Sequence, residues 1–345
     1  MRSGSFLGNL FRNSKLGGAA IVVSSALSSL APTQAGTVTF GSGTDTFSME
    51  FVNIGNANNA ADTTGTPNPA GSVGYNYLIG KHEVSRGMIT KYNANFGTAN
   101  SLVVSSQNNG TLDSAATQIH WQEAARFVNW LNTSTNGFAA YKFATGSPVG
   151  GTAGNPIAWI ASEVDDYDAD NPFRSKRARY VLPTVDEWYK AAFYDADNSV
   201  YYDYAQGSDT APTSVISGTD QNTAVFSVSE TASIYAAGGL SKYGVMGMSG
   251  NAFELIETAY DGTNNDGAEN RMAGGGAWWD SDVLLLSSGG LISRGVSSAN
   301  AASGFRVAAL SLHSNPAPVP EPASMVIFGL GALGMAYRSR RRTSR

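Results

Sequence analysis

Histidine and cysteine are the side chains that most often hold a catalytic metal or act as a nucleophile. The 345-residue chain has no cysteine and three histidines, His82, His120 and His313. No two of them share a metal-ligand spacing, and an iron site of two histidines and one carboxylate needs two that converge. We therefore expect structural roles for all three. No Ser/His/Asp set or phosphate-binding loop stands out in the sequence either.

One acidic segment has part of the spacing of a calcium loop. Asp166, Asp168 and Asp170 match the first three ligand positions of an EF-hand. The sixth position, however, is asparagine instead of glycine, and the twelfth is arginine instead of glutamate. We therefore predict a solvated acidic loop here, and we interpret the acidic segment at 261–266 in the same way.

Two helices are predicted to support the domain. In the first, over 121–132, apolar residues recur at three- and four-residue spacing on one face: Trp121, Ala124, Ala125, Val128 and Leu131. The second begins after Thr184, which forms a capping box with Glu187 three residues later. Both patterns are local, so they predict helices without reference to the rest of the chain.

Shorter elements and loops account for the remainder. Strands are predicted at 47–52 and 75–79, followed by a short helix that Ser85 caps. Beyond residue 200 the pattern indicates short strands and glycine-rich loops without a further long helix. With 39 glycines and a charged fraction of 14%, the composition favours a loop-rich α+β fold.

The N-terminus has the features of an export signal. Three basic residues precede an apolar stretch at 16–30, and Thr33-Gln34-Ala35 offers a small-residue cleavage site. We predict a signal peptide over residues 1–35 that signal peptidase removes, with a short lead-in at 36–46 before the main domain. An uncleaved anchor is the alternative.

The C-terminus carries a second signal. A Pro-rich linker at 312–319 is followed by Pro320, Glu321 and Pro322, then by the uncharged apolar run Met325 to Tyr337 and five arginines. At ~1.5 Å per residue this run makes one short hydrophobic helix of about 20 Å, less than the ~20 residues of a comfortable membrane span. The arginines are expected to stay in the cytoplasm.

Residues 320–345 as a whole resemble the PEP-CTERM sorting signal of exported bacterial proteins. The resemblance implies processing by an exosortase-type enzyme. The protein would be anchored for a time in the inner membrane by its C-terminal helix and would then reach the cell surface or the extracellular matrix. The alternative is a permanent C-terminal anchor.

The net charge of the exported part argues against nucleic acids as partners. The chain has 22 basic and 27 acidic residues, and removal of three basic residues at the start and five at the end leaves 14 against 27, a net charge of −13. A surface this acidic repels phosphate backbones, so we expect no nucleic-acid partner.

Six motifs in order resemble the formylglycine-generating enzyme (sulfatase-modifying factor) family, from about residue 47 to 311. They are Ile79-Gly-Lys-His-Glu-Val-Ser85, Trp121 to Leu131, Leu182-Pro-Thr-Val-Asp-Glu-Trp188, Tyr243 to Glu254, Gly274-Gly-Gly-Ala-Trp278 and Gly304-Phe-Arg-Val307. The resemblance implies a C-type-lectin-like α+β fold with much irregular structure. Fold alone does not carry the activity with it.

The family's chemistry requires two cysteines that hold copper and oxidise a substrate cysteine. Those positions fall on Asp280 and Leu285 in this chain. Because soft Cu(I) needs thiolate or thioether ligands and the chain has no cysteine, formylglycine generation by that route is excluded.

The family also binds calcium near its Gly-Asn-x-x-Glu motif. Carried over by position, Gly250 and Ala252 would offer backbone carbonyls and Glu254 a carboxylate, whereas the fourth position, usually Asn or Asp, is Gly247. Calcium wants six to eight oxygens, so this site is weakened. Calcium is thus the one cofactor that the resemblance implies, and the alternative is that Glu254 binds a glycine-rich turn.

A ligand groove is expected where the family's active groove lies. Trp278, Trp279 and Asp280, with Arg294 or Arg306, would place aromatic faces beside a carboxylate and a guanidinium, a combination suited to a sugar ring or a peptide. The alternative is that one tryptophan is core and the other half-covered.

The sequence as a whole therefore predicts an exported, non-catalytic protein of the cell surface or matrix, which binds extracellular polysaccharide or another matrix component. One alternative is an enzyme on the same scaffold with changed chemistry, a cysteine-independent oxidase or hydroxylase of the non-haem iron type. The other is a structural matrix component with no specific ligand.

Overall fold

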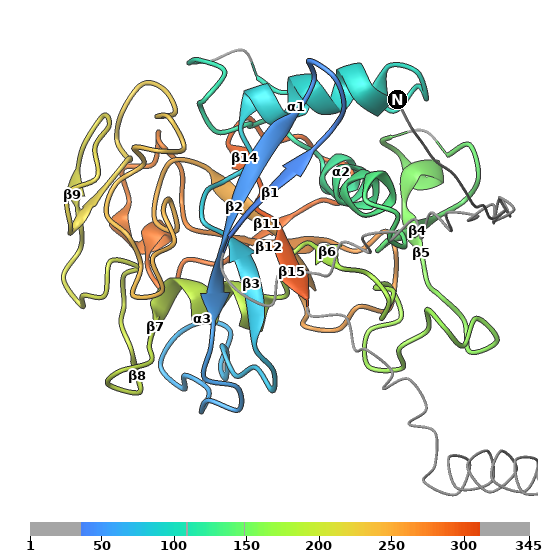
Figure 1. Ribbon diagram of the computed structural model, residues 1–345. Coiled ribbons are helices and arrows are strands. Elements are labelled where there is room, and N and C mark those ends of the chain that lie inside the picture. Colours follow the sequence, from blue (N-terminus) through green and yellow to red (C-terminus); the bar gives the residue numbers. More distant parts are fainter. Residues whose placement is uncertain (1–35, 108–109, 148, 311–345) are drawn as a thin grey trace, which may run out of the picture. The chain divides into compact units, whose positions relative to one another are not determined.

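The computed structural model describes residues 36–310 except 108, 109 and 148 (Figure 1). The predicted signal peptide, Pro-rich linker, sorting motif and C-terminal hydrophobic helix lie outside the described residues, as does His313. None of the helices formed by the described residues is long and apolar enough to span a bilayer.

The first of two larger sheets joins the two ends of the domain. Its five strands are all antiparallel and have the order β1-β2-β3-β15-β6. They are β1 (Gly36–Phe40), β2 (Phe47–Ile54), β3 (Tyr77–Gly80), β15 (Ala308–Leu310) and β6 (Tyr180–Val181). The blue β1–β2 hairpin and the red β15 therefore belong to one sheet in Figure 1. The segment 36–46, predicted as a lead-in, supplies a strand to this sheet.

The second sheet is built entirely from the last quarter of the domain. Its order is β13-β12-β11-β14, and only the β11–β14 pair is parallel. The strands are β11 (Phe253–Ala259), β12 (Arg271–Gly274), β13 (Ile292–Arg294) and β14 (Ser303–Gly304). An irregularity between Leu255 and Ala259 interrupts the β11–β12 register.

The three predicted helices are confirmed. They are α1 (Arg86–Tyr92), which continues as the π-helix η1 (Asn93–Gly97), α2 (Trp121–Ser134) and α3 (Val185–Phe193). Ser85 accepts from the backbone N–H of Met88 at the start of α1. In the capping box of α3, Thr184 Oγ1 accepts from Glu187 N and Glu187 Oε2 accepts from Thr184 N, at 3.2 and 2.7 Å.

Short elements and loops connect these parts, which confirms the loop-rich α+β prediction. The paired strands are β4 (Lys142–Phe143) with β5 (Pro156–Ile157), β7 (Tyr194–Asp195) with β8 (Val200–Tyr201), and β9 (Thr213–Ser214) with β10 (Thr223–Ala224). Two 3₁₀ turns, η2 (Thr152–Gly154) and η3 (Val283–Leu286), complete the set.

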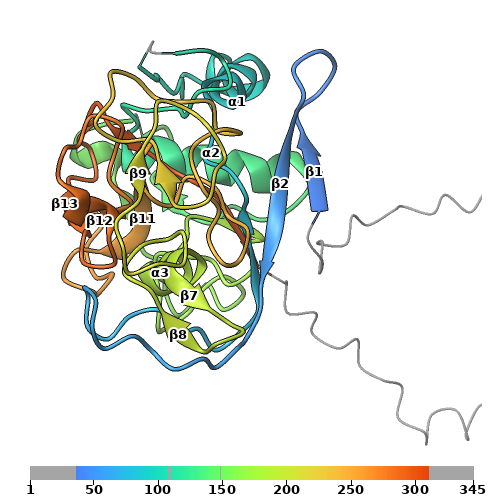
Figure 2. The same cartoon turned by 90° about the vertical axis from the view of Figure 1, so that its left-hand side faces the viewer.

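Aromatic side chains of α2 form the contact between that helix and the first sheet. Phe127 stacks on Phe47 of β2 with ring centroids 6.1 Å apart, and its edge meets Phe305 at 5.5 Å. Figure 2 shows α2 crossing beside the β1–β2 hairpin. Full burial of an aromatic or large aliphatic side chain contributes roughly 1.5–3 kcal/mol, so this contact holds the hairpin against the core.

Candidate functional site

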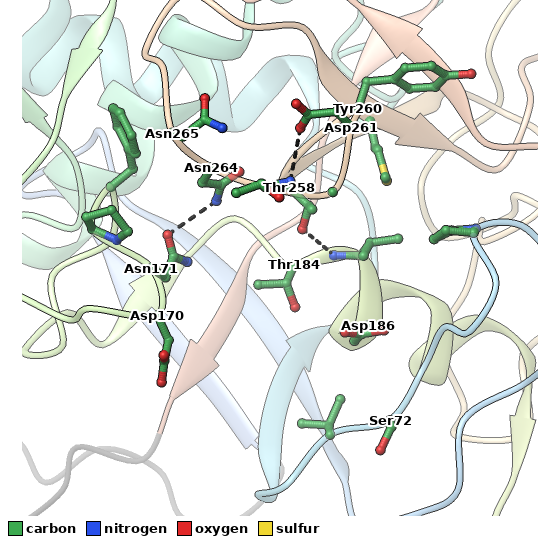
Figure 3. Close-up of a pocket in the computed structure, with 18 of the residues that line it drawn as sticks. Ser72, Asp170, Asn171, Thr184, Asp186, Thr258, Tyr260, Asp261, Asn264 and Asn265 are labelled. Carbon is green, nitrogen blue, oxygen red and sulfur yellow. Dashed lines mark hydrogen bonds between the residues drawn. The ribbon is translucent and has the colours of Figure 1, made fainter.

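An open groove of about 1020 Å³ lies at the surface of the domain (Figure 3). We call it the polar groove. Its polar lining comes from three aspartates, three asparagines and a set of hydroxyl groups: Asp170, Asp186, Asp261, Asn171, Asn264, Asn265, Ser72, Thr184, Thr258, Thr263, Tyr75 and Tyr260. None of its described lining residues is Lys, Arg or His.

The start of α3 fixes one wall of the polar groove. Val185 N donates to Thr258 Oγ1 at 2.9 Å, which ties the first residue of α3 to strand β11. Asp186 Oδ1 accepts from Gly71 N at 2.7 Å, which ties the same turn to the loop before β3. Because the capping box holds this turn in place, Thr184 and Asp186 have fixed positions in the groove.

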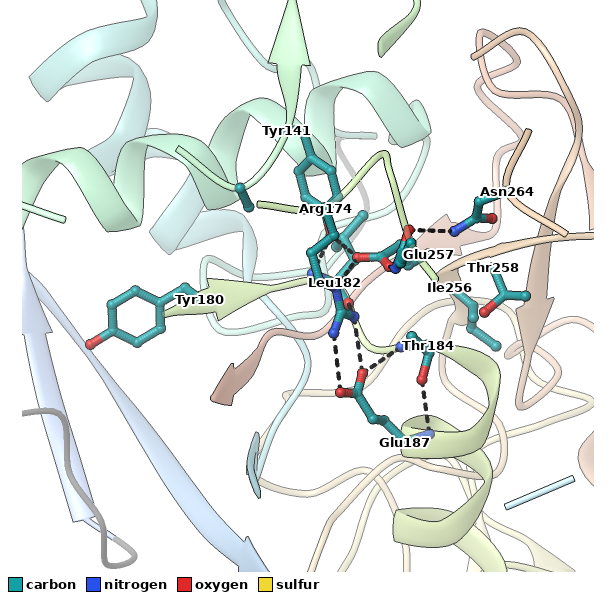
Figure 4. Close-up of polar contacts among 12 residues, drawn as sticks. Tyr141, Arg174, Tyr180, Leu182, Thr184, Glu187, Ile256, Glu257, Thr258 and Asn264 are labelled. Atoms are coloured by element: carbon teal, nitrogen blue, oxygen red, sulfur yellow. Dashed lines mark hydrogen bonds and ion pairs between the residues drawn. The ribbon is translucent and has the colours of Figure 1, made fainter. Parts of the chain in front are cut away.

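A buried ion cluster lies beneath the polar groove (Figure 4), and we call it the Arg174 cluster: Arg174, Glu187 and Glu257. Arg174 donates from Nε to Glu257 Oε2 at 2.6 Å, and from its two terminal nitrogens to both oxygens of Glu187 at 3.2 and 3.1 Å. Both glutamate side chains are fully buried. One guanidinium thus bridges two carboxylates that would otherwise lack a counter-charge.

The Arg174 cluster also orders side chains that line the groove. Asn171 Nδ2 donates to Glu257 Oε1 at 2.5 Å, and Asn264 Nδ2 donates in turn to Asn171 Oδ1 at 3.2 Å. On the other side of the cluster, Tyr75 donates its hydroxyl to Glu187 Oε1 at 2.7 Å. The Arg174 cluster forms the floor of the groove, and these hydrogen bonds hold each of the three side chains in a defined rotamer.

The pKa shifts of the floor and the wall have opposite directions. Burial favours the neutral acid, but the Arg174 guanidinium outweighs it and lowers the pKa of Glu187. Burial likewise opposes the charge of Arg174, yet Glu187 and Glu257 raise its pKa above the usual range. In the wall, burial raises the pKa of Asp186. With no cation in its described lining, the groove is a negative surface.

A second buried cluster surrounds the predicted calcium ligand, and we call it the Arg306 cluster: Arg306, Glu254 and Glu83. Arg306 donates from Nε to Glu254 Oε2 at 2.5 Å and from a terminal nitrogen to Glu254 Oε1. Trp188 Nε1 also donates to Glu254, at 2.6 Å. Arg306 further donates to two backbone carbonyls, Gly80 O and Met246 O, each at 2.8 Å.

Glu83 is the third member of the Arg306 cluster. In the described part of the chain, amide N–H groups, and no guanidinium, donate hydrogen bonds to its carboxylate. Its two oxygens accept from Asn251 Nδ2 at 2.5 Å and from Ala252 N at 3.1 Å. Burial raises the pKa of Glu83 to about 8, and the nearby Glu254 carboxylate adds to the rise. Gly247 has a φ of +72°, and a Cβ there would lie 3.0 Å from Glu83 Oε2, which explains the glycine.

The calcium prediction on Gly250, Ala252 and Glu254 remains a prediction. The structure shows that both oxygens of the Glu254 carboxylate already accept from Arg306. A calcium ion would have to compete with that guanidinium for its one side-chain ligand, and calcium prefers several carboxylate or carbonyl oxygens.

The structure separates Arg306 from the other residues of the predicted ligand groove. Trp278 is buried and Trp279 is 44% exposed, with ring centroids 4.7 Å apart, which matches the alternative of one core and one half-covered tryptophan. Asp280 and Arg294 are half-buried, and burial raises the pKa of Asp280 while Arg294 lowers it in part. Arg306 is fully buried in its own cluster and does not reach this surface.

Two sequence interpretations need a correction or an addition. Asp166 is buried, not solvated, because Arg177 donates to both of its oxygens at 3.1 and 2.5 Å. The arginine at the twelfth EF-hand position therefore supplies the positive charge of this loop.

His120 is the N-cap of α2, and its backbone N–H donates to Glu123 at 2.8 Å. In the described part of the chain, no group of three or more His, Asp or Glu side chains has a metal-site arrangement.

Sequence reasoning missed the polar groove because six stretches that are separate in the sequence form it. The only local signals were the capping box at Thr184 and the acidic segment 261–266, which was interpreted as solvated. In the structure Asn264 Oδ1 accepts from Arg271 and from Ala259 N, at 2.8 Å each, so part of that segment is fixed. Asp261 stays exposed and lines the groove.

Comparisons with known proteins agree with this architecture. Residues 32–310 match the model of the "Sulfatase-modifying factor enzyme 1-like domain", and residues 318–342 match the "PEP-CTERM protein-sorting motif". No curated protein sequence matches the chain significantly.

Two solved structures share the fold. One is Treponema denticola variable protein 1, at 20% identity and a TM-score of 0.55, covering 79% of this chain and 98% of that one. The other is CarF, at 21% identity and a TM-score of 0.55, covering 76% of this chain and 98% of that one. The chain therefore belongs to the family of proteins with a sulfatase-modifying factor enzyme 1-like domain, and it is an exported protein with a PEP-CTERM sorting signal.

Proposed function

We propose that this exported protein is a non-catalytic binding module for hydroxyl-rich glycans and that the ligand lies in the polar groove. In this proposal, signal peptidase and an exosortase-type enzyme process the two ends of the chain. The domain then remains at the cell surface or in the extracellular polysaccharide matrix. The sorting motif supports the export route, and the groove supports the binding role.

The single observation that carries the proposal is a groove of sugar-sized volume with preorganised polar walls. Asn171, Asn264 and Tyr75 are held by hydrogen bonds that lead to the Arg174 cluster, so they lose little rotamer freedom on binding. Tyr75 and Tyr260 are 43% and 52% exposed, and each presents a ring beside oxygen and amide groups. A ring face next to fixed hydrogen-bonding groups suits a pyranose.

The charge of the polar groove limits the class of ligand that it can bind. Asp170, Asp186 and Asp261 line the groove, and none of the described lining residues is basic. An anionic sugar, sulfate or phosphate would meet carboxylates without a compensating cation, which costs binding energy. Neutral polysaccharides, whose hydroxyls can donate to these carboxylates, are therefore the favoured class.

The exposed face of Trp279, with Asp280 and Arg294, is proposed as a second, smaller contact surface for the same polymer. An indole face on the surface of the domain is a suitable platform for one sugar ring. Arg306 is left out of this surface because it is buried in its own cluster.

A binding assay with matched tyrosine variants tests the groove. Tyr260→Ala removes a groove side chain, and Tyr235→Ala removes one that is equally exposed, at 52%, but lies outside the groove. We expect the purified protein to be retained on neutral glycans, with affinity reduced roughly tenfold in Tyr260→Ala and unchanged in Tyr235→Ala. Retention on no neutral glycan, or equal loss in both variants, would remove the groove from the proposal.

The enzyme alternative has a separate test. Elemental analysis of the same preparation would show stoichiometric iron if the scaffold were a non-haem iron oxidase or hydroxylase. Glycan retention without iron supports the binding module.

A further inference from the structure

A second cavity, of about 190 Å³, lies away from the polar groove, between strand β2, the turn after β3 and helix α1. It is lined by Thr37, Ser48, Met49, Glu50, His82, Met88 and Tyr235. Met49 and Met88 are buried and form its inner side, whereas the glutamate and the tyrosine are exposed at its rim. The cavity thus joins two thioethers and one imidazole near the surface.

The bend after β3 brings His82 to the cavity beside β2. The β2–β3 ladder ends with Phe51 paired to Gly80, and Lys81 N donates to Glu50 O at 2.8 Å. His82 follows in the bend and lines the same cavity as Met49 of β2. The third residue, Met88, enters from the first turn of α1, which Ser85 caps.

The imidazole is oriented as a ligand. His82 Nδ1 lies 2.8 Å from the carbonyl oxygen of Ile234, so the Nδ1–H donates to that carbonyl and leaves the lone pair on Nε2. Nε2 faces the rim, 3.9 Å from Glu50 Oε2. A backbone carbonyl that fixes the far nitrogen is the usual support of a metal-binding histidine. The edge-to-face ring of Tyr235, 4.9 Å away, holds the imidazole from the side.

We propose that His82 Nε2 and the thioether sulfurs of Met49 and Met88 form a binding site for a soft monovalent metal ion, Cu(I) or Ag(I). Thioether ligands select soft ions over calcium, magnesium or zinc. Methionine has three rotatable bonds, so both sulfurs can turn toward an ion within the existing cavity.

This site is separate from the family's cysteine positions. Those fall on Asp280 and Leu285, and neither lines the cavity. The proposed role is binding of the ion, with no redox step. It also does not depend on glycan binding, since the two cavities share no lining residue.

The experiment is an anaerobic competition titration of the purified exported protein with Cu(I) bicinchoninate. We expect one Cu(I) per chain, and at least about tenfold weaker binding in each of His82→Ala, Met49→Leu and Met88→Leu. Leucine conserves the volume of methionine, so the core is retained, and thermal melting of each variant checks this. X-ray absorption of the Cu(I) complex should show sulfur and nitrogen neighbours.

Two further variants make the result specific. Met272→Leu is the matched control, since Met272 is a buried methionine that lines the polar groove, and it should bind Cu(I) like the wild type. Glu50→Gln should also leave Cu(I) binding unchanged. Absence of stoichiometric Cu(I), unchanged affinity in both methionine variants, or binding that depends on Glu50 and prefers zinc would each overturn the proposal.

Discussion

The Arg174 and Arg306 clusters each bury one guanidinium with two glutamates, but they divide the charge differently. Arg174 contacts Glu187 and Glu257 directly. Arg306 contacts Glu254 alone, and Glu83 receives amide hydrogen bonds instead. The consequence is opposite pKa shifts: the pKa of Glu187 is lowered, whereas that of Glu83 is raised to about 8. A shared counter-ion thus lowers the pKa of a buried acid, and an unshared one leaves a buried acid with a raised pKa.

The largest effect is expected for Arg306→Met. Among the described residues, this change leaves the buried Glu254 carboxylate with the neutral indole N–H of Trp188 as its side-chain donor, next to the second acid Glu83. We expect a loss of about 3–5 kcal/mol in the free energy of unfolding, the range for breaking a buried ion pair. Urea denaturation at pH 7 measures it. A loss below that for Arg174→Met would reverse the ranking of the two clusters.

Arg174→Met should cost about 3 kcal/mol, because Glu187 and Glu257 keep hydrogen bonds from Thr184 N and Tyr141 after the arginine is gone. It should also weaken retention on neutral glycans, since Asn171 is anchored to Glu257. Arg306→Met serves as the control for this second effect: a folded Arg306 variant should keep glycan binding.

Glu83→Gln tests whether the Arg306 cluster makes the stability of the protein depend on pH. Because the folded-state pKa of Glu83 is about 8 and its ordinary value is 4.5, folding takes up a proton between these two values. Wild-type stability should therefore be complete below pH 4.5 and fall as the pH rises toward 8, by at most about 1.4 kcal/mol per pH unit. The glutamine variant should lose this slope. A slope that persists in the variant would assign the titration to another group.

The smallest effect is expected at the margin of the Arg174 cluster. Tyr75→Phe removes one hydrogen bond to Glu187 from a partly exposed side chain, which should cost about 1 kcal/mol. Lys91→Met is the control, since its ion pair with Asp45 is exposed and should contribute less than about 1 kcal/mol. Chemical denaturation of both variants gives the difference.

Local sequence was sufficient for the parts of the fold that local interactions determine. The caps at Ser85 and Thr184 lie within three residues of the backbone groups that they bind, so they could be predicted directly. The family motifs implied the C-type-lectin-like α+β fold and no strand order for its sheets. Neither source showed that Glu83 and Asn251, 168 positions apart, share a hydrogen bond.

The candidate site was the less predictable part. Tyr75, Asn171 and Asn264 come together only through the Arg174 cluster, and nothing in their spacing indicates this. The charge of Asp166 suggested solvent exposure, but Arg177 allowed it to be buried. For Trp278 and Trp279, the sequence could state both alternatives, and only the packing of the two rings distinguishes core from surface.

The position of β15 has a consequence for how the protein is made. This strand is the last described segment of the chain, yet it lies between β3 and β6 inside the first sheet. The chain is synthesised and exported from its N-terminus, so the β1–β2 hairpin is made long before residues 308–310. The first sheet is complete only after β15 has paired with β3 and β6. The sorting motif begins at residue 318, only eight residues later. A chain that stops before β15 therefore lacks both a strand of the first sheet and the sorting motif.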